Sequence, residues 1–210
     1  MNKLTIDDFK KVFKDYIPGP LGYYRYYSVL VPLVEREGEL HILYEVRAET
    51  LRTQPGQVSF PGGRIEDGET PEECAIREAC EELCIQPSDI EIISPLDYLH
   101  TYSNFTMYPF LGTIDYDACS KVTASLEEVK ELFFVPVSYL METEPLVYNS
   151  EVYPKIPEDF PYEKIYEKNG YNWRKGSTSI PIYQYKGYAI WGMTALITQH
   201  LINKMKGNCL

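Results

Sequence analysis

The sequence predicts an α/β protein in which a mixed β-sheet lies between helices. Strand-like apolar runs and helical patterns alternate irregularly along the 210-residue chain, which is typical of a sheet with helices on both faces. One capped helix follows a glycine turn in the middle of the chain, and a second amphipathic helix closes it. The length and the balance of apolar and charged residues suit one core, so we expect a single domain over 1–210.

The first elements are a helix, a hairpin and a short strand. Apolar residues at helical spacing predict a helix over about 5–16, and the turn residues of 18–22 end it. Two apolar runs, YYSVLVPLV (26–34) and ELHILYEV (39–46), flank EREG and predict a β-hairpin. The segment GQVSFPGG (56–63) predicts a short strand that ends in turn glycines.

The next helix carries the clearest start signal in the chain. Thr70 is a good N-cap, Pro71 suits the first helical position, and Glu73 completes a capping box three residues after the cap. We expect this helix to end near Leu83, ahead of Pro87.

The segment that follows predicts strands and one short helix. Residues 90–114 contain two strand patterns around YSN (102–104). The run LEEVKELFFVPVSYLM (126–141) predicts a strand that leads into a short helix through Pro136.

The C-terminal part predicts a hairpin and the closing helix. The run IPIYQYKGYAIWG (180–192) predicts a hairpin across Lys186 and Gly187, and MTALITQHLINKM (193–205) predicts an amphipathic helix. Residues 153–179 are rich in tyrosine, lysine and proline without periodicity, so we expect a long, ordered loop there.

Composition argues against several functional classes. The formal net charge of −11 argues against nucleic-acid binding, because such binding depends on clustered lysine and arginine. No apolar run approaches the roughly 20 residues that cross a bilayer, so we expect no membrane partner. The opening residues lack the apolar core of a signal peptide, and the five cysteines show no zinc-site spacing. We therefore expect a cytoplasmic protein with reduced thiols, and its oligomeric state stays open.

Three carboxylates crowd one face of the helix that begins at Thr70. Glu78, Glu81 and Glu82 are three and four residues apart, so they project from neighbouring positions. Each like-charged pair at this spacing destabilises a helix by about 0.2 to 0.5 kcal/mol. The pattern predicts either a solvated acidic surface or a site in which a cation lies between the carboxylates. Oxygen ligands of this kind suit Mg²⁺ or Mn²⁺.

The wider stretch FPGGRIEDGETPEECAIREACEELCI (60–85) decides between these readings, because it resembles the Nudix box. The matching positions are Gly63, Glu69, Arg77, Glu78, Glu81, Glu82 and Ile85. Cys84 stands where the family has glycine, at the expected end of the helix. The resemblance implies a Nudix-type α/β/α sandwich and a metal-dependent diphosphatase.

The same resemblance implies roles for individual residues. Glu78, Glu81 and Glu82 would hold Mg²⁺ or Mn²⁺, with the Gly62 carbonyl as a further ligand, and Glu69 would pair with Arg77 to hold the helix. Glu78 and Glu82 would then act in catalysis through the metal. A general base is also expected, and both Glu78 and Glu128, in the later run LEEV, are candidates.

Upstream of the box, RAETLRTQPGQVSFPGG (47–63) resembles the extra signature of the coenzyme A pyrophosphatase subgroup. Ala48 and Gln54 depart from that signature. The resemblance implies hydrolysis of coenzyme A or its derivatives to 4′-phosphopantetheine and adenosine 3′,5′-bisphosphate. Arg47, Arg52 and Gln57 would bind the substrate, and arginine can grip phosphate oxygens through two parallel hydrogen bonds.

Two other functions stay open from the sequence. One is a Nudix enzyme acting on ADP-ribose or another nucleoside diphosphate derivative, which would share the metal site and differ in the pocket loops. The other is a Nudix-fold binding module without catalysis, against which the intact glutamates argue.

Overall fold

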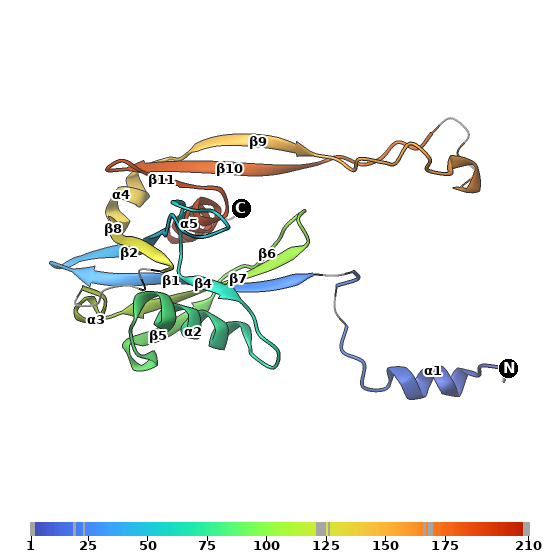
Figure 1. Ribbon diagram of the computed structural model, residues 1–210, viewed down its shortest axis with the longest axis horizontal. Coiled ribbons are helices and arrows are strands. Elements are labelled where there is room, and N and C mark those ends of the chain that lie inside the picture. Colours follow the sequence, from blue (N-terminus) through green and yellow to red (C-terminus); the bar gives the residue numbers. More distant parts are fainter. Residues whose placement is uncertain are drawn as a thin grey trace.

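A mixed β-sheet forms the centre of the computed structural model, which describes residues 3–18, 20–22, 24–120, 125, 127–165, 167 and 170–207 (Figure 1). Its strands are β1 (Arg25–Arg36), β2 (Glu39–Arg47), β3 (Val58–Ser59), β4 (Gly62–Arg64), β5 (Ile90–Pro95), β6 (Leu99–His100), β7 (Phe105–Ile114) and β8 (Val129–Pro136). The main path runs β3-β2-β1-β7-β5, with β4 beside β1, β6 beside β7 and β8 beside β2. Strands β1 and β7 are parallel and the other pairs are antiparallel, so the sheet is mixed as predicted.

The predicted hairpin of β1 and β2 is present. It pairs Leu33 with Ile42 and closes at Arg36 and Glu39. Glu37 and Gly38 in the turn both have positive φ, at 55° and 77°, which is the geometry of tight hairpin turns that match strand twist.

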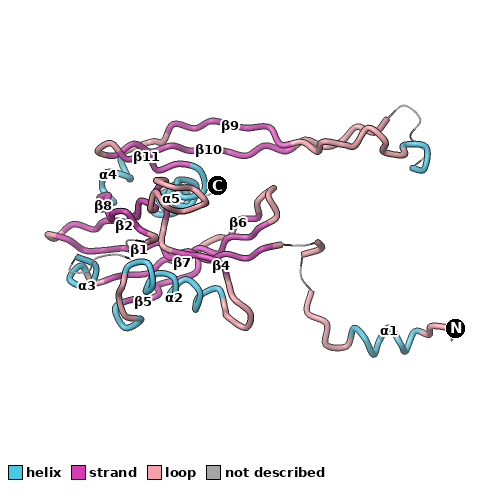
Figure 2. Tube along the Cα trace, in the orientation of Figure 1, coloured by secondary structure: helices cyan, strands magenta, loops and turns pink. Residues whose placement is uncertain are grey.

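Helices cover both faces of the sheet, as the sequence predicts (Figure 2). Helix α2 (Pro71–Leu83) packs on one face, where its Ala75, Ala79 and Leu83 join Leu30 and Leu43 of the sheet in one buried cluster. Helix α5 (Gly192–Met205) packs on the other face. Alternation along β2 explains this division, because successive side chains of a strand point to opposite faces.

A second sheet lies beyond α5 and continues the layering (Figure 1). It consists of β9 (Leu146–Val152), β10 (Gly176–Tyr185) and β11 (Tyr188–Trp191), in the order β11-β10-β9. The predicted turn at Lys186 and Gly187 joins β10 to β11. The short helix α4 (Val137–Glu142) follows β8, with Pro136 at its N-cap, as expected.

Several bounds differ from the prediction. Strand β9 was not predicted, and β10 begins at Gly176, so residues 176–179 belong to a strand and the loop covers 153–175. Strand β9 is exposed over most of its length, so it lacks the alternation that marks a half-buried strand, and its pairing with β10 is a long-range event. Residues 90–114 contain three strands rather than two. The short helices α3 (Tyr116–Ser120), η1 (Pro87–Asp89) and η2 (Tyr162–Ile165) were also not predicted.

The N-terminal helix α1 (Ile6–Phe13) is shorter than the predicted 5–16. Thr5 caps it through a capping box with Asp8. The helix lies apart from the sheet, and Phe9 and the rest of its residues are exposed (Figure 1).

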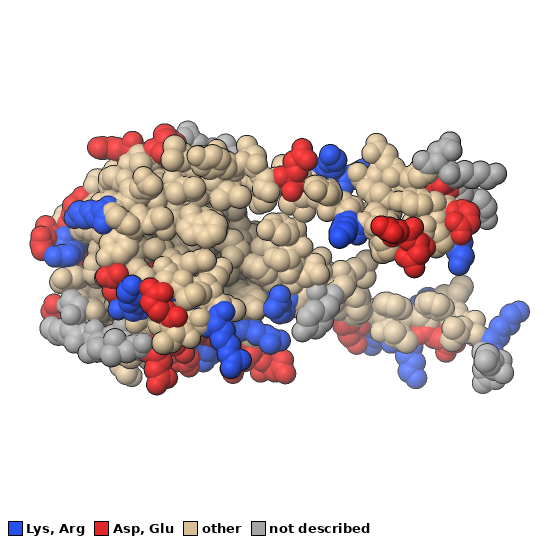
Figure 3. Space-filling view, turned by 45° about the horizontal axis from the view of Figure 1, so that its top comes forward, with Lys and Arg blue, Asp and Glu red and all other residues tan. Residues whose placement is uncertain are grey.

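Acidic and basic side chains are intermingled on the face shown in Figure 3. Within the described residues, no helix is both long enough and apolar enough to cross a bilayer.

Candidate active site

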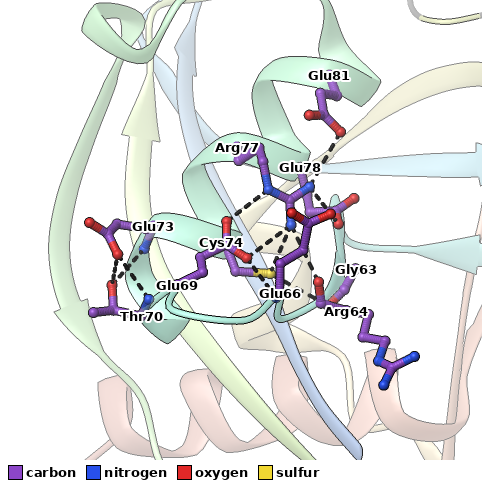
Figure 4. Close-up of polar contacts among 10 residues, drawn as sticks. All are labelled: Gly63, Arg64, Glu66, Glu69, Thr70, Glu73, Cys74, Arg77, Glu78 and Glu81. Carbon is purple, nitrogen blue, oxygen red and sulfur yellow. Dashed lines mark hydrogen bonds and ion pairs between the residues drawn. The ribbon is translucent and has the colours of Figure 1, made fainter.

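The site is built on helix α2 and the glycine turn before it. Thr70 and Glu73 form the predicted capping box: the Glu73 N–H donates to Thr70 Oγ1 at 3.2 Å, and the Thr70 N–H donates to Glu73 Oε2 at 2.8 Å (Figure 4). Pro71 occupies the first turn. These local bonds fix where α2 begins and therefore which of its residues face the sheet.

Two glycines let the turn pack between β1 and α2. Gly62 pairs with Val29 of β1, and a Cβ at position 62 would collide with the Ser28 carbonyl oxygen and lie 2.7 Å from Val29 Cα. A Cβ at Gly63 would instead collide with the carboxylate of Glu78. Glycine at both positions therefore brings the turn backbone against the glutamates of α2.

Arg77 links the loop to the helix in the way that the sequence predicts. Its Nε and Nη2 donate to the two carboxylate oxygens of Glu69 at 2.7 and 3.1 Å (Figure 4). Its Nη1 donates to Glu78 at 2.9 Å and to Glu81 at 3.4 Å. The Arg77 hydrogen bonds lower the pKa of Glu69 to about 2. Arg77 thus offsets the like-charge repulsion along this helix.

The three glutamates of the box occupy different environments. Glu82 is 3% exposed and accepts a hydrogen bond from the Gly62 N–H at 2.8 Å. Glu78 is partly buried, whereas the side chain of Glu81 is 58% exposed. Burial raises the pKa of Glu82 and of Glu78, and neighbouring carboxylates raise both further. Within the described part of the chain, no three acidic, histidine or cysteine side chains already form a metal site.

Sequence reasoning missed Glu45 of β2, which lies with these groups. It is fully buried, and its Oε1 accepts a hydrogen bond from Ser59 Oγ at 2.8 Å. Burial raises the pKa of Glu45, and the charges of Glu128 and Glu78 raise it further. A lone glutamate inside the apolar run ELHILYEV is the signal that could have pointed to it.

The predicted base, Glu128, is exposed and lies just before β8. Its carbonyl oxygen accepts a hydrogen bond from the Ala48 N–H at 2.8 Å, directly beyond the end of β2. Glu128 therefore lies on the rim of the buried carboxylates.

The predicted substrate residues occupy three different places. Arg47 is partly buried, and its charge lowers the pKa of both Glu45 and Glu82. Arg52 is exposed on the loop after β2. Gln57 lines a pocket of about 300 Å³ together with Val58, Tyr188 and Trp191.

Two buried atoms show that this site suits a cation and an anion together. Glu45 Oε2 is an acceptor and Arg47 Nε is a donor, and neither has a hydrogen-bond partner among the described residues. A divalent cation suits the free carboxylate oxygen, and a phosphate oxygen suits the free guanidinium N–H. The surrounding donors are oxygens, which Mg²⁺ and Mn²⁺ prefer. The residues present therefore fit a metal-bound diphosphate.

Comparison with known proteins assigns the chain to a family. The model of the NUDIX domain matches residues 25–155, which include all eight strands of the central sheet, helix α2 and strand β9 of the second sheet. The chain belongs to the Nudix hydrolase family. Members of this family generally use divalent metal ions, in agreement with the donors described above.

Two curated Nudix relatives align with different shares of this chain. A 135-residue segment is 36% identical to the peroxisomal coenzyme A diphosphatase NUDT7 of Mus musculus, over 64% of this chain and 56% of the mouse protein. Over 202 residues the chain is 32% identical to the uncharacterized Nudix hydrolase NudL of Enterobacter sp. (strain 638), over 94% of this chain and 93% of that protein.

Solved Nudix structures also resemble the chain. An Ap4A hydrolase binary complex from C. elegans has a TM-score of 0.45 and 19% identity, over 53% of this chain and 80% of that chain. A MutT/nudix family protein from Enterococcus faecalis has a TM-score of 0.48 and 11% identity, over 97% of this chain and 70% of that chain.

Cys84 replaces the glycine of the Nudix box and keeps the turn that ends α2. Its φ and ψ are 52° and 42°, in the left-handed region, and its N–H donates to the Cys80 carbonyl. The cysteines in the described residues are free: Cys74, Cys80, Cys84 and Cys119. Cys209 lies outside the described residues.

We expect Cys84→Gly to raise stability and leave activity unchanged. Removing a side chain from a left-handed position relieves about 1 kcal/mol, which corresponds to a Tm about 2–4 °C higher for a chain of this size. Cys80→Gly is the matched control, because glycine inside α2 should lower the Tm. Loss of metal-dependent activity in folded Cys84→Gly would show a role for this thiol beyond the turn.

Proposed function

We propose that the chain hydrolyses the diphosphate bond of coenzyme A or its derivatives, giving 4′-phosphopantetheine and adenosine 3′,5′-bisphosphate. The observation that carries the proposal is the buried free donor of Arg47 close to the free acceptor of Glu45 and the carboxylate of Glu82. This arrangement suits a phosphate oxygen and a cation side by side. The likeness to a mouse protein named as a coenzyme A diphosphatase supports the substrate class.

The proposed metal ligands are the glutamates of α2 and the glycine turn. Glu78 and Glu82 would hold Mg²⁺ or Mn²⁺ from the sheet-facing side, with the Gly62 carbonyl and the more exposed Glu81 as further donors. When bound, such a cation lowers the pKa of a water and offsets charge on the leaving phosphate. Arg77 holds Glu78 and Glu81 in place from the outer side, through the bonds described above.

We assign the general base to Glu128, with Glu78 as the alternative. Glu128 is exposed and can therefore exchange a proton with solvent after each turnover. Burial raises the pKa of Glu78, and its ion pair with Arg77 at 2.9 Å partly offsets this rise.

The substrate would be held at three places. Arg47 would bind the diphosphate, because its free N–H lies beside the buried carboxylates. The pocket at Gln57 would accept the adenine, where Trp191 is 44% exposed and Tyr188 stacks on Phe133 with ring centroids 3.9 Å apart. Arg52, exposed on the loop between them, would bind the 3′-phosphate.

The substrate assignment makes Arg52→Ala a selective variant. We expect it to lower kcat/KM for coenzyme A roughly 10- to 150-fold, the value of one charge-assisted contact, and to leave dephospho-coenzyme A nearly unchanged. Arg47→Ala should lower kcat/KM for both substrates by similar factors. Arg174→Ala removes an exposed arginine from the 153–175 loop and serves as the control. Equal losses on both substrates in Arg52→Ala would exclude 3′-phosphate recognition by this residue.

A substrate panel with Mg²⁺ and Mn²⁺ tests the proposal as a whole. Faster hydrolysis of ADP-ribose or another nucleoside diphosphate derivative than of any coenzyme A form would replace the assigned substrate. Ligand binding without phosphate-bond cleavage would indicate a non-catalytic module. The proposal includes a cytoplasmic location, which cell fractionation tests.

A further inference from the structure

We propose that Glu45 is a further ligand of the divalent cation, which it binds through Oε2 from strand β2. The inference rests on the metal-dependent activity proposed above. It adds a carboxylate that lies outside the Nudix box, about 30 residues ahead of the glutamates of α2 in the sequence.

The topology of the sheet places Glu45 on the face that α2 covers. Leu43 of β2 is buried with Ala79 and Leu83 of α2. Glu45 is two residues further along the same strand, so its side chain points to the same face as Leu43. Tyr44, between them, belongs to the cluster beneath α5 on the opposite face.

The neighbours of Glu45 are the other acidic residues of the site. Ser59, which donates to Glu45, lies three residues before Gly62, and the Gly62 N–H donates to Glu82 Oε2 at 2.8 Å. The Ala48 N–H, three residues beyond Glu45, donates to the Glu128 carbonyl. Glu45 therefore lies on the side of the site that the sheet forms, next to the other acidic residues.

Ser59 holds Glu45 in one orientation. The two residues are paired across β2 and β3, and Ser59 Oγ donates to Glu45 Oε1 at 2.8 Å. With Oε1 occupied, the second oxygen is the one available to a ligand. Oε2 is buried and has no hydrogen-bond partner in the described structure.

No protein group that the structure describes balances the charge of this carboxylate directly. A buried ionised carboxylate is costly unless it is paired or binds a metal. Between the described residues, no hydrogen bond or ion pair joins Arg47 to Glu45, and Arg47 Nε is itself without a partner. Glu82, almost fully buried nearby, is a second carboxyl group that needs a positive partner once it is ionised. A divalent cation between these carboxylates resolves the imbalance, with Arg47 left for phosphate.

Binding of Mn²⁺ to the full chain without substrate tests the role of Glu45. Free Mn²⁺ is measured by electron paramagnetic resonance during a titration of wild type, Glu45→Gln and Glu49→Gln. Glutamine keeps the shape of the side chain and an oxygen for Ser59, so we expect a fold like that of wild type. The expected result is Mn²⁺ affinity reduced roughly 10- to 100-fold in Glu45→Gln. Glu49→Gln removes the same charge from a side chain that is 64% exposed and should bind like wild type.

The outcomes separate this inference from the proposed function. Equal Mn²⁺ affinity in wild type and folded Glu45→Gln overturns the role of Glu45 and leaves the proposed function standing. If wild type binds no Mn²⁺, both the role of Glu45 and the proposed function are overturned. If wild type binds Mn²⁺ through Glu45 but hydrolyses no coenzyme A, only the proposed function falls. If Glu45→Gln does not fold, Glu45→Asp decides: a carboxylate one methylene shorter must weaken Mn²⁺ binding roughly 10-fold, and unchanged affinity overturns the role.

Discussion

Glu82→Gln and Glu78→Gln each lower turnover by several orders of magnitude, on the order of 10³-fold, while the metal-free fold stays intact. Glu82 is buried and Glu78 is partly buried, and each variant removes a proposed metal ligand. Glutamine at position 82 can still accept the hydrogen bond of the Gly62 N–H. Steady-state kinetics with saturating Mg²⁺ or Mn²⁺ measures the loss of turnover.

The pH dependence of stability in the metal-free protein gives a second readout for Glu82→Gln. A carboxyl whose pKa is raised on folding binds its proton more tightly in the folded state. The contribution of Glu82 to stability is therefore fully present below the ordinary carboxyl pKa of 4.5 and is lost as the pH rises through the raised pKa of Glu82. Glutamine cannot ionise, so Glu82→Gln should have the higher Tm. Its advantage over wild type should be larger at pH 8 than at pH 5.

Glu72→Gln is the matched control, because Glu72 lies on the exposed side of the same helix. It should keep both turnover and stability close to wild type. A clearly lower Tm in both Glu78→Gln and Glu82→Gln would mean that these carboxylates are structural.

Gly62→Ala and Gly63→Ala should fail in different ways, although they are adjacent. At position 62 a Cβ collides with backbone of β1, where φ is +156°. Backbone cannot move aside easily, so we expect a loss of about 3 kcal/mol or more of unfolding free energy. At position 63 the Cβ collides with the end of the Glu78 side chain, which can move. We therefore expect a stable fold in Gly63→Ala but roughly 10²-fold lower activity, because Glu78 is displaced.

Chemical denaturation and Mn²⁺ binding distinguish the two glycine variants. Gly176→Ala is the control, because its Cβ would meet its nearest atom at 3.8 Å and its φ is not positive. Wild-type Mn²⁺ affinity in Gly63→Ala would show that the glutamate does not need the space that this glycine leaves.

Elements that depend on neighbours in sequence could be predicted without the structure. The capping box of α2, the hairpin of β1 and β2 and the turn at Lys186 and Gly187 form as expected. Each is fixed by bonds or dihedral preferences within a few residues, so composition and spacing are sufficient. The pairing of Glu69 with Arg77, which the resemblance to the Nudix box implies, is present as well.

Elements that depend on distant partners could not be predicted. Strand β9 is exposed and forms because it pairs with β10 across the 153–175 loop. The predicted loop therefore ended at 179, although residues 176–179 belong to β10. Pairing between segments so far apart leaves no local periodicity in the sequence.

The sequence by itself determined the family, through its resemblance to the Nudix box, and the candidate ligands Glu78, Glu81 and Glu82, because their spacing on one helix is a local property. Only the tertiary structure decided that Glu81 faces outward, that Arg47 lies beside the carboxylates while Arg52 is exposed, and that β2 supplies Glu45. Burial and charge balance arise when β2, β3 and α2 pack together. No local pattern specifies which polar atom remains without a partner after that packing.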